Sequence, residues 1–419
     1  MDERLQKIVD EAQVEFGLDA YRLERYGLYK QRDSKGEAYY QFNMEWFPQE
    51  SGEPVEEDLN PEGTASIDYN IQEKRFESVL FVEGKSFSTR TPFKGKTPEE
   101  VAAWVEQHTG WTYLQDFKLA QVNGNEFQFQ FDVDGIRLSP GFSMTVQFDE
   151  EGKLTAFSTY GSPPRPEEIE QSAFTLTLEE IEPIVKRQLQ LVKFPSEAEK
   201  RFVPAYAMEE VFVTVDGKRI IPFFEHERSE VKADEVMEWD TTLEMDIERQ
   251  PIEFTSKAGV EDAFGNIGLE KLRLTEEQVE QGKKVVRDLL RAEYPDDSGK
   301  WTLYKFQRQE QFIEAHCKMN EENPSVFQRK LVVFIDPEQL SVMNFMDNGA
   351  MFEIFESFAP AEQEKVTHEE AFEKMISYIT LDPTYLYDEF TGKYILCGLL
   401  DAAEAVDAVT GEIIALSDL

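Results

Sequence analysis

The sequence predicts an α+β protein made of several small units in series, each a helix packed on a small antiparallel sheet. A start of the type Thr-x-Glu-Glu, or close to it, recurs at positions 97, 177, 275 and 367. Helical periodicity follows each start, and segments that alternate apolar and polar residues follow each helix. These starts lie roughly 80 to 100 residues apart, which favours small domains joined in series over a tight solenoid. The alternative is that capping boxes recur by chance on unrelated helices.

The chain has 419 residues, enough for two to four domains of ordinary size. Its hydrophobic content of 41% can fill real cores, which argues against wholesale disorder. The repeated order of helix and strands divides the chain more finely. The five predicted units span residues 1–90, 91–168, 169–272, 273–360 and 361–419.

The charge is strongly acidic, with a formal net value of −41. Nucleic acid and anionic membrane are therefore not expected as partners, because phosphate binding requires clustered Lys and Arg. A solvated, soluble surface is the simplest interpretation. A basic partner comes next, followed by divalent-cation loading or adaptation to salt.

Two cysteines, Cys317 and Cys397, exclude a disulfide scaffold and a Cys-rich zinc site. Both stand in apolar surroundings, so buried free thiols are expected. The first residues run into a charged amphipathic helix without the basic and apolar regions of a signal peptide. No run of apolar residues is long enough to span a membrane. We therefore expect a cytoplasmic protein.

The first unit begins with a helix over residues 2–16, whose apolar positions fall on one stripe. Strands are predicted at 21–30 and 39–47, joined by a hairpin turn at 33–36, and two further strands follow at 65–71 and 76–82. The residues on the helical stripe are Leu5, Ile8, Val9, Ala12 and Phe16.

The second unit opens at Thr97, a good N-cap, with Pro98 at the first helical position and Glu100 placed for a capping box. Strands with clean alternation follow at 127–133 and 142–148. A Pro-rich segment then provides the strongest linker candidate in the chain, at residues 161–166.

The third unit starts a helix at Thr177, with Ile181, Ile184, Val185 and Leu189 on its apolar stripe. A strand containing three alternating valines then leads into the Asp-Gly pair at 216–217, a strong hairpin signal.

The fourth unit begins at Thr275, and its helix ends before Pro295. Strands are expected at 301–307, 311–318, 326–335 and 340–345. The fifth unit begins at Thr367 and closes with a tight polar turn within residues 406–414, whose sequence is VDAVTGEII. In this turn Asp407 can accept from backbone amides, and Gly411 can adopt a positive φ.

This closing hairpin resembles that of the PepSY domain, a short helix followed by an antiparallel sheet. The serial arrangement, together with the Val-Pro-Ala-Tyr sequence at residues 203–206, resembles the YcdB/YcdC repeat proteins of Bacillus-type bacteria. PepSY domains occur in protease propeptides and are thought to inhibit peptidases. The resemblance therefore implies a protein or peptide partner, with a peptidase suspected.

No residue pattern amounts to a catalytic signature. The histidines His108, His226, His316 and His368 form no H-E-x-x-H or H-x-x-x-H pair, so we expect core or surface roles. His316 and Cys317 are adjacent in a strand and should point to opposite faces. Residues 132–135 hint at a calcium loop but lack its further acidic ligands.

The sequence shows no esterase, P-loop or dinucleotide fingerprint. An aromatic cluster could form a ligand face, although a sheet packing against its helix is the stronger interpretation. Its members are Tyr39, Tyr40, Phe42 and Trp46.

We therefore expect a non-enzymatic protein-binding or scaffolding protein without cofactor, metal or catalytic residues, and peptidase modulation is the sharpest version of this hypothesis. Sheet edges or grooves between units would hold the partner. The alternative is an enzyme or small-ligand-binding protein whose site forms between units. A deep cleft with converging perturbed titratable groups would favour this alternative.

Overall fold

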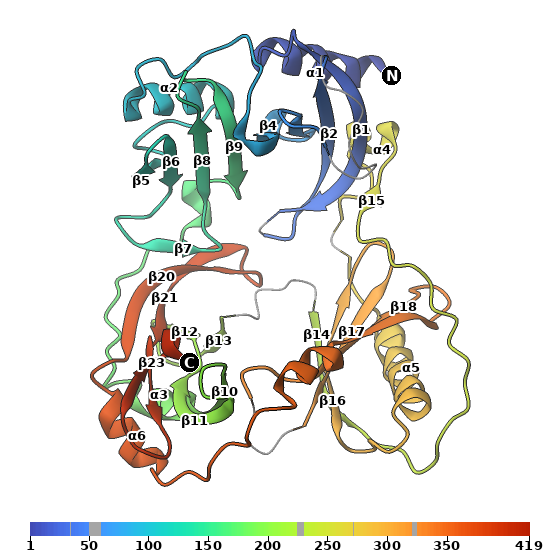
Figure 1. Ribbon diagram of the computed structural model, residues 1–419, viewed down its shortest axis with the longest axis vertical. Coiled ribbons are helices and arrows are strands. Elements are labelled where there is room, and N and C mark those ends of the chain that lie inside the picture. The colour runs from blue at the N-terminus through green and yellow to red at the C-terminus, as the bar shows by residue number, and fades with distance from the viewer. Residues whose placement is uncertain (34, 50–59, 224–229, 271, 321–324) are drawn as a thin grey trace. The chain divides into compact units, whose positions relative to one another are not determined.

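The computed structural model describes residues 1–33, 35–49, 60–223, 230–270, 272–320 and 325–419 (Figure 1). It confirms the α+β class, with 20% of residues in helices and 39% in strands. The chain forms two compact units. The first comprises Met1–Glu170, Thr255–Lys271 and Tyr385–Tyr394, and the second comprises Gln171–Phe254, Leu272–Thr384 and Ile395–Leu419. The finer division into five units stays a prediction.

A nine-stranded sheet with the order β15-β1-β2-β3-β4-β9-β8-β6-β5 forms the first unit. It joins two meanders, because β4 pairs with β9 through Ser78↔Ser158 and Leu80↔Ala156. The bounds of the strands are β1 Tyr21–Arg32, β2 Ala38–Pro48, β3 Ala65–Asn70, β4 Arg75–Phe81, β5 Lys118–Asn123, β6 Glu126–Gln130, β8 Ser143–Phe148, β9 Leu154–Tyr160 and β15 Ser256–Lys257. This unit also contains the short elements β7 (Arg137–Ser139), η1 (Val82–Gly84) and η2 (Pro166–Glu168).

Three helices share the apolar core of this sheet: α1 (Glu3–Glu15), α2 (Pro98–Thr109) and α4 (Val260–Gly265). The predicted stripe on α1 is confirmed, since all five of its residues are buried. Alternation along β2 separates two faces of the sheet. Its even-numbered residues from Tyr40 to Trp46 are buried in the core, whereas its odd-numbered residues from Tyr39 to Glu45 are only partly buried. The face away from the helices is therefore polar.

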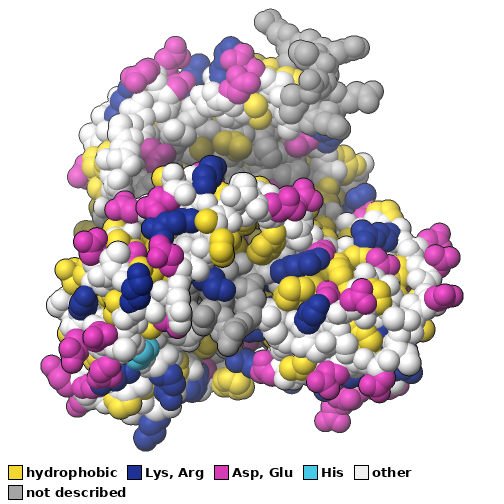
Figure 2. Space-filling model, turned by 60° about the horizontal axis from the view of Figure 1, so that its bottom comes forward, with side chains coloured by type: hydrophobic (Ala, Val, Ile, Leu, Met, Phe, Trp, Pro, Cys, Tyr) yellow, Lys and Arg dark blue, Asp and Glu magenta, His cyan; other side chains and the backbone are white. Residues whose placement is uncertain are grey.

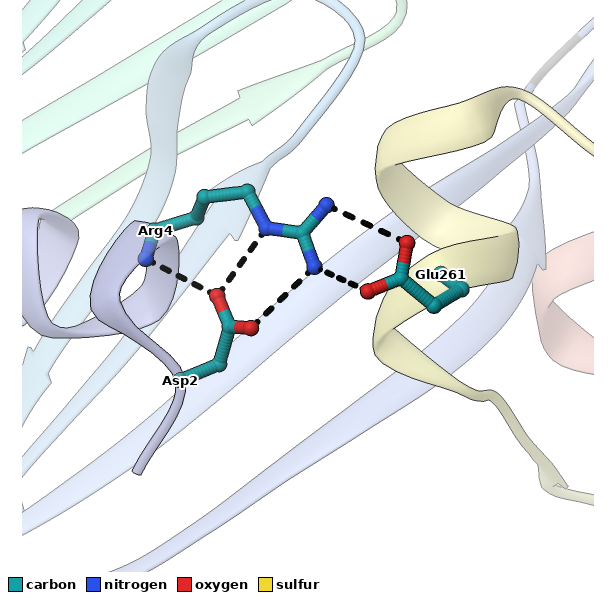
Figure 3. A network of polar contacts seen from close by, with 3 residues as sticks. All are labelled: Asp2, Arg4 and Glu261. Carbon is teal, nitrogen blue, oxygen red and sulfur yellow. Dashed lines mark hydrogen bonds and ion pairs between the residues drawn. The ribbon is translucent and has the colours of Figure 1, made fainter.

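An ion-pair network joins the start of α1 to α4 (Figure 3). Asp2 caps α1 by accepting from the amide of Arg4 at 2.8 Å. The Arg4 guanidinium lies 3.0 Å from Asp2 and 2.6 Å from Glu261. All three side chains are partly or largely exposed, so the network contributes orientation more than stability.

Two segments of similar element order (Figure 1), which belong to the second unit except for residues 385–394, build a common core. One consists of α3 (Glu182–Gln188), β10 (Leu189–Ser196), β11 (Arg201–Met208), β12 (Val211–Thr214) and β13 (Ile220–Pro222). The other consists of α6 (His368–Met375), β20 (Thr380–Asp388), β21 (Lys393–Asp401), β22 (Glu404–Asp407) and β23 (Ile413–Ala415), followed by η4 (Leu416–Asp418).

These two segments exchange their second hairpins. One sheet has the order β10-β11-β22-β23, and the other contains β13-β12-β21-β20. The exchange rests on antiparallel pairing of Tyr206 with Val406 in the first sheet and of Val211 with Leu400 in the second. Residues from 176–213 and 371–408 therefore bury each other in one core.

A third sheet of the second unit, with the order β14-β16-β17-β18-β19, packs on α5 (Glu276–Glu293) around a separate core. The core includes Trp301, Leu303 and Cys317, all fully buried. The strands are β14 Glu230–Met237, β16 Trp301–Arg308, β17 Ile313–Met319, β18 Lys330–Ile335 and β19 Val342–Asp347, and η3 (Asn348–Phe355) follows.

The predicted helix starts differ in how they are realised. Thr97, Thr275 and Thr367 are N-caps, and the last two form complete capping boxes. Glu100 instead accepts from the amides of Gly95 and Lys96, at 2.8 Å each. Thr177 and Glu180 exchange the hydrogen bonds of a capping box, yet α3 begins only at Glu182. Leu189, predicted on its stripe, begins β10.

Acidic side chains are spread over the face that Figure 2 shows, with lysines and arginines among them. This distribution agrees with a solvated acidic surface. In the described part of the chain, none of the helices has the length and apolar composition needed to cross a membrane.

Candidate functional site

The closing turn of the chain is built as the sequence predicts. Asp407 accepts from the amides of Val409 and Thr410 at 2.7 Å each, and Gly411 has a φ of 75°. The ammonium group of Lys374 in α6 donates to the carbonyl of Gly411 at 2.6 Å. The polar groups of the turn form hydrogen bonds with one another and with Lys374, so the turn has a structural role.

The other residues considered from the sequence do not converge. Cys317 is in the core, where burial raises the pKa of its thiol to about 12. The neighbouring His316 contacts Glu314, two residues away on the same face of β17, at 3.0 Å. His316 and Cys317 therefore lie on opposite faces of the strand, as expected. Asp132 accepts from the amide of Gly135 and pairs with Lys118, which suits a turn. His226 lies outside the described residues.

A solvent-connected hollow of about 320 Å³ lies in the first unit where the ends of α1 and β4, the start of β9 and one side of α2 meet. We call it the Trp104 hollow. No sequence pattern indicated a hollow at this place. The lining residues are Glu15, Phe16, Phe81, Ser88, Arg90, Pro92, Glu100, Ala103, Trp104, Gln107, His108 and Leu154.

The lining of the Trp104 hollow is partly aromatic and apolar. Phe16, Phe81 and Leu154 belong to the buried core, so their exposed atoms are few and fixed. Trp104 is partly buried, and its indole meets the ring of Phe157 edge-on at 5.2 Å between centroids. Rings fixed in this way can contact an apolar group without losing much side-chain freedom.

His108 holds Trp104 from the other side. The two rings stack with centroids 3.8 Å apart, at residues four apart on α2. One ring nitrogen of His108 lies 2.6 Å from the carbonyl of Trp104, and the other lies 2.6 Å from the carboxylate of Glu15. His108 is thus a positioning residue that links α2 to the end of α1.

Glu15 is electrostatically stabilised at this point. The hydrogen bond from His108 lowers the pKa of the Glu15 carboxyl, although burial acts in the opposite direction. The Arg90 guanidinium lies 3.7 Å from the same carboxylate oxygen and is half exposed. The Ser88 hydroxyl accepts a hydrogen bond from the backbone amide of Arg90 and donates one to the carbonyl of Phe16 at 2.6 Å. The polar rim is therefore anchored to the backbone.

The polar side chains of His108 and Ser88 in this lining already have partners within the chain. His108 has both ring nitrogens engaged, and the lining residues include no cysteine and no lysine. Ser88, the one lining serine, uses its hydroxyl to bind the backbone of Phe16. Among the described residues, no group of three or more His, Cys, Asp or Glu is arranged to hold a metal ion.

Comparisons with known proteins add little. No family model matches the chain, and no curated protein matches it. Among solved structures, the chain is similar to the Bacillus megaterium YpeB C-terminal domain, with 10% identity over 83% of this chain and 97% of that one. The TM-score is 0.24, so this similarity carries no argument about fold or function.

Proposed function

We propose that this chain is a non-enzymatic protein-binding or scaffolding protein whose first unit holds a large apolar side chain of a partner in the Trp104 hollow. The observation that carries the proposal is the partly buried indole of Trp104, which packs against His108 and Phe157 in a hollow whose lining includes buried apolar residues. Aromatic anchors in preformed pockets contribute strongly to protein recognition.

One apolar anchor supplies part of the free energy that a specific contact requires. Burying one large apolar side chain contributes about 1.5 to 3 kcal/mol. Because the rings that receive it are already packed, little further ordering opposes binding. The net charge of −41 favours approach by a basic segment, so we propose a partner peptide that carries its apolar anchor among Lys or Arg residues.

The finer version of the proposal concerns the family and the partner. The closing hairpin, with its Asp407 turn, supports membership of the PepSY and YcdB/YcdC type, in which each unit is a helix on a small antiparallel sheet. On that basis the partner is a peptidase whose activity the chain modulates. A peptidase assay with and without the protein tests this version.

A peptide library displayed against the whole protein tests binding at the Trp104 hollow. Enriched peptides should contain a large apolar residue flanked by basic ones. Trp104→Ala should weaken their binding at least about tenfold, since the anchor loses its aromatic contact. Val14→Ala, at an exposed position of α1, is the matched control and should bind normally. Equal binding by both variants would reject the Trp104 hollow as the site.

The alternative function is an enzyme or small-ligand-binding protein with a site between predicted units. A different part of the first unit supports it. A second hollow in the first unit brings together Arg75 and Glu77, a pair of buried charged groups.

A further inference from the structure

The second hollow has a volume of about 370 Å³ and opens at the strand ends of the nine-stranded sheet. It lies where β1 ends and β2 begins, beside the β3–β4 turn and the end of β9, and we call it the Arg75 pocket. Residues of the first two predicted units line it. They are Arg32, Asp33, Glu37, Ala38, Tyr39, Asn70, Gln72, Glu73, Arg75, Glu77, Thr159, Tyr160, Gly161 and Ser162.

Arg75 is a buried cation whose hydrogen-bond donors are not used within the described chain. Its side chain is only 9% exposed, and its Nε has no hydrogen-bond partner. The guanidinium is held 4.4 Å from the ring centre of Trp111. It forms ion pairs with the carboxylates of Glu73 at 3.7 Å and Glu77 at 3.6 Å, and both distances are too long for a hydrogen bond. Buried guanidinium groups normally satisfy their donors, whereas the two Nη groups of Arg75 have ion pairs without a hydrogen bond and are the groups that a ligand carboxylate would contact.

Glu77 is the negatively charged partner of Arg75 in this pocket. Its side chain is 16% exposed and accepts a hydrogen bond from the side-chain amide of Asn70 at 2.8 Å. Burial raises the pKa of the Glu77 carboxyl, because the hydrogen bonds from Asn70 and Tyr39 and the charge of Arg75 do not offset the lost hydration. A cationic group beside Glu77 would stabilise its carboxylate.

We propose that the Arg75 pocket binds a compact zwitterion of the α-amino-acid class, with its carboxylate on Arg75 and its ammonium group on Glu77. Arg75 and Glu77 are 3.6 Å apart, which matches a ligand whose two charges are attached to one carbon atom. A single anion would meet the four carboxyl groups of the lining, and a single cation would leave Arg75 without an acceptor. The volume is in the range of small-molecule sites.

The rest of the lining limits the side chain that such a ligand can carry. Thr159, Tyr160 and Ser162 line the pocket on the β9 side, and the Thr159 hydroxyl donates to the carbonyl of Glu77 at 3.2 Å. Tyr160 is more than half exposed, so its ring is available to cover the ligand. We expect preference for an amino acid with a polar or small side chain. This site is separate from the Trp104 hollow and does not depend on partner binding there.

Isothermal titration calorimetry with the whole protein and each of the common α-amino acids tests the proposal. At least one should bind saturably, and its N-acetyl and carboxamide derivatives should bind at least about tenfold more weakly, because each loses one charge. Arg75→Gln and Glu77→Gln should each reduce affinity for the unmodified amino acid by a similar factor. Arg22→Gln, on the same sheet but outside the pocket, should leave it unchanged.

Several results would overturn the proposal. They are no saturable binding by any amino acid, equal binding of the acetylated and free forms, or normal binding by both pocket variants. If a pocket variant fails to fold, the comparison of derivatives on the unaltered protein still decides. Retained binding after Trp104→Ala separates this site from the proposed peptide site, so the two proposals can fail independently.

Discussion

At the scale of single residues, the polar groups of the first unit fall into two kinds. His108 and Glu15 satisfy each other at 2.6 Å and fix the position of Trp104. Arg75 and Glu77 approach only to 3.6 Å and leave hydrogen-bonding capacity facing a hollow. Pairs of the first kind belong to the scaffold, whereas pairs of the second kind can exchange their contacts for those of a ligand.

Replacing Glu15 tests the scaffold pair. Glu15→Gln keeps the shape of the side chain but removes the charge that His108 contacts, so the free energy of unfolding should fall by about 1 to 3 kcal/mol at pH 7. Urea denaturation with fluorescence detection measures the change. Unaltered stability would show that the His108 contact contributes nothing net.

The pH dependence of this contribution has a definite sign. The folded state lowers the pKa of Glu15, so it stabilises the protein at pH values above the ordinary value of 4.5. The stabilisation should decline as the pH falls below 4.5 and the folded-state carboxyl takes up its proton. The difference between the unaltered protein and Glu15→Gln should shrink in that range.

At the scale of elements, a start signal is effective only where the following residues can continue the helix. α5 has a complete capping box at Thr275 and 18 residues, four of which are buried. The segment after Thr177 makes the same capping contacts, but Pro183 and the early start of β10 leave only seven helical residues. The capping contacts are alike, and the residues that follow them separate the outcomes.

Substituting the two threonines tests this difference. Thr275→Ala should lower the stability of the second unit by about 0.5 to 2 kcal/mol, because an amide at the start of α5 loses its acceptor. Thr177→Ala should cost less, since no α-helix begins there. Thr275→Ser keeps a hydroxyl acceptor and should behave nearly as the unaltered protein. Thermal unfolding of the three variants would contradict this view if Thr177→Ala were the most damaging.

At the scale of the whole molecule, the hairpin exchange in the second unit ties together segments far apart in sequence. β12 and β21 pair across about 190 residues of chain, through Val211 and Leu400. Apolar residues of both segments are buried in one core, and the sheet that packs on α5 has a separate core. Damage to one of these cores should therefore spread through its members and leave the other largely intact.

Hydrogen exchange can detect this coupling. Leu400→Ala removes a fully buried side chain and should destabilise its core by about 2 to 5 kcal/mol, with faster amide exchange in β11 and β12. Leu303→Ala is the matched control, because Leu303 is equally buried but belongs to the core under α5. If both variants affected β12 equally, the two cores would not be independent.

Much of the fold could be predicted from the sequence, because local chemistry determines it. Periodicity predicted the stripe of α1 and the alternation of β6 and β8, and capping residues located the starts of α2, α5 and α6. The acidic composition and the turn at Asp407 were also evident. These features depend on residues within a few positions of one another.

Only the tertiary structure decided which strands pair and where the hollows lie. β11 and β12 are rich in apolar residues and largely buried, but many apolar strands could pair with them equally well, and pairing with β22 and β21 is one choice among them. Arg75 and Tyr39 likewise meet in one pocket although 36 positions separate them. Contacts between residues so far apart in the sequence depend on the packing of the whole unit, and no local sequence pattern predicts them.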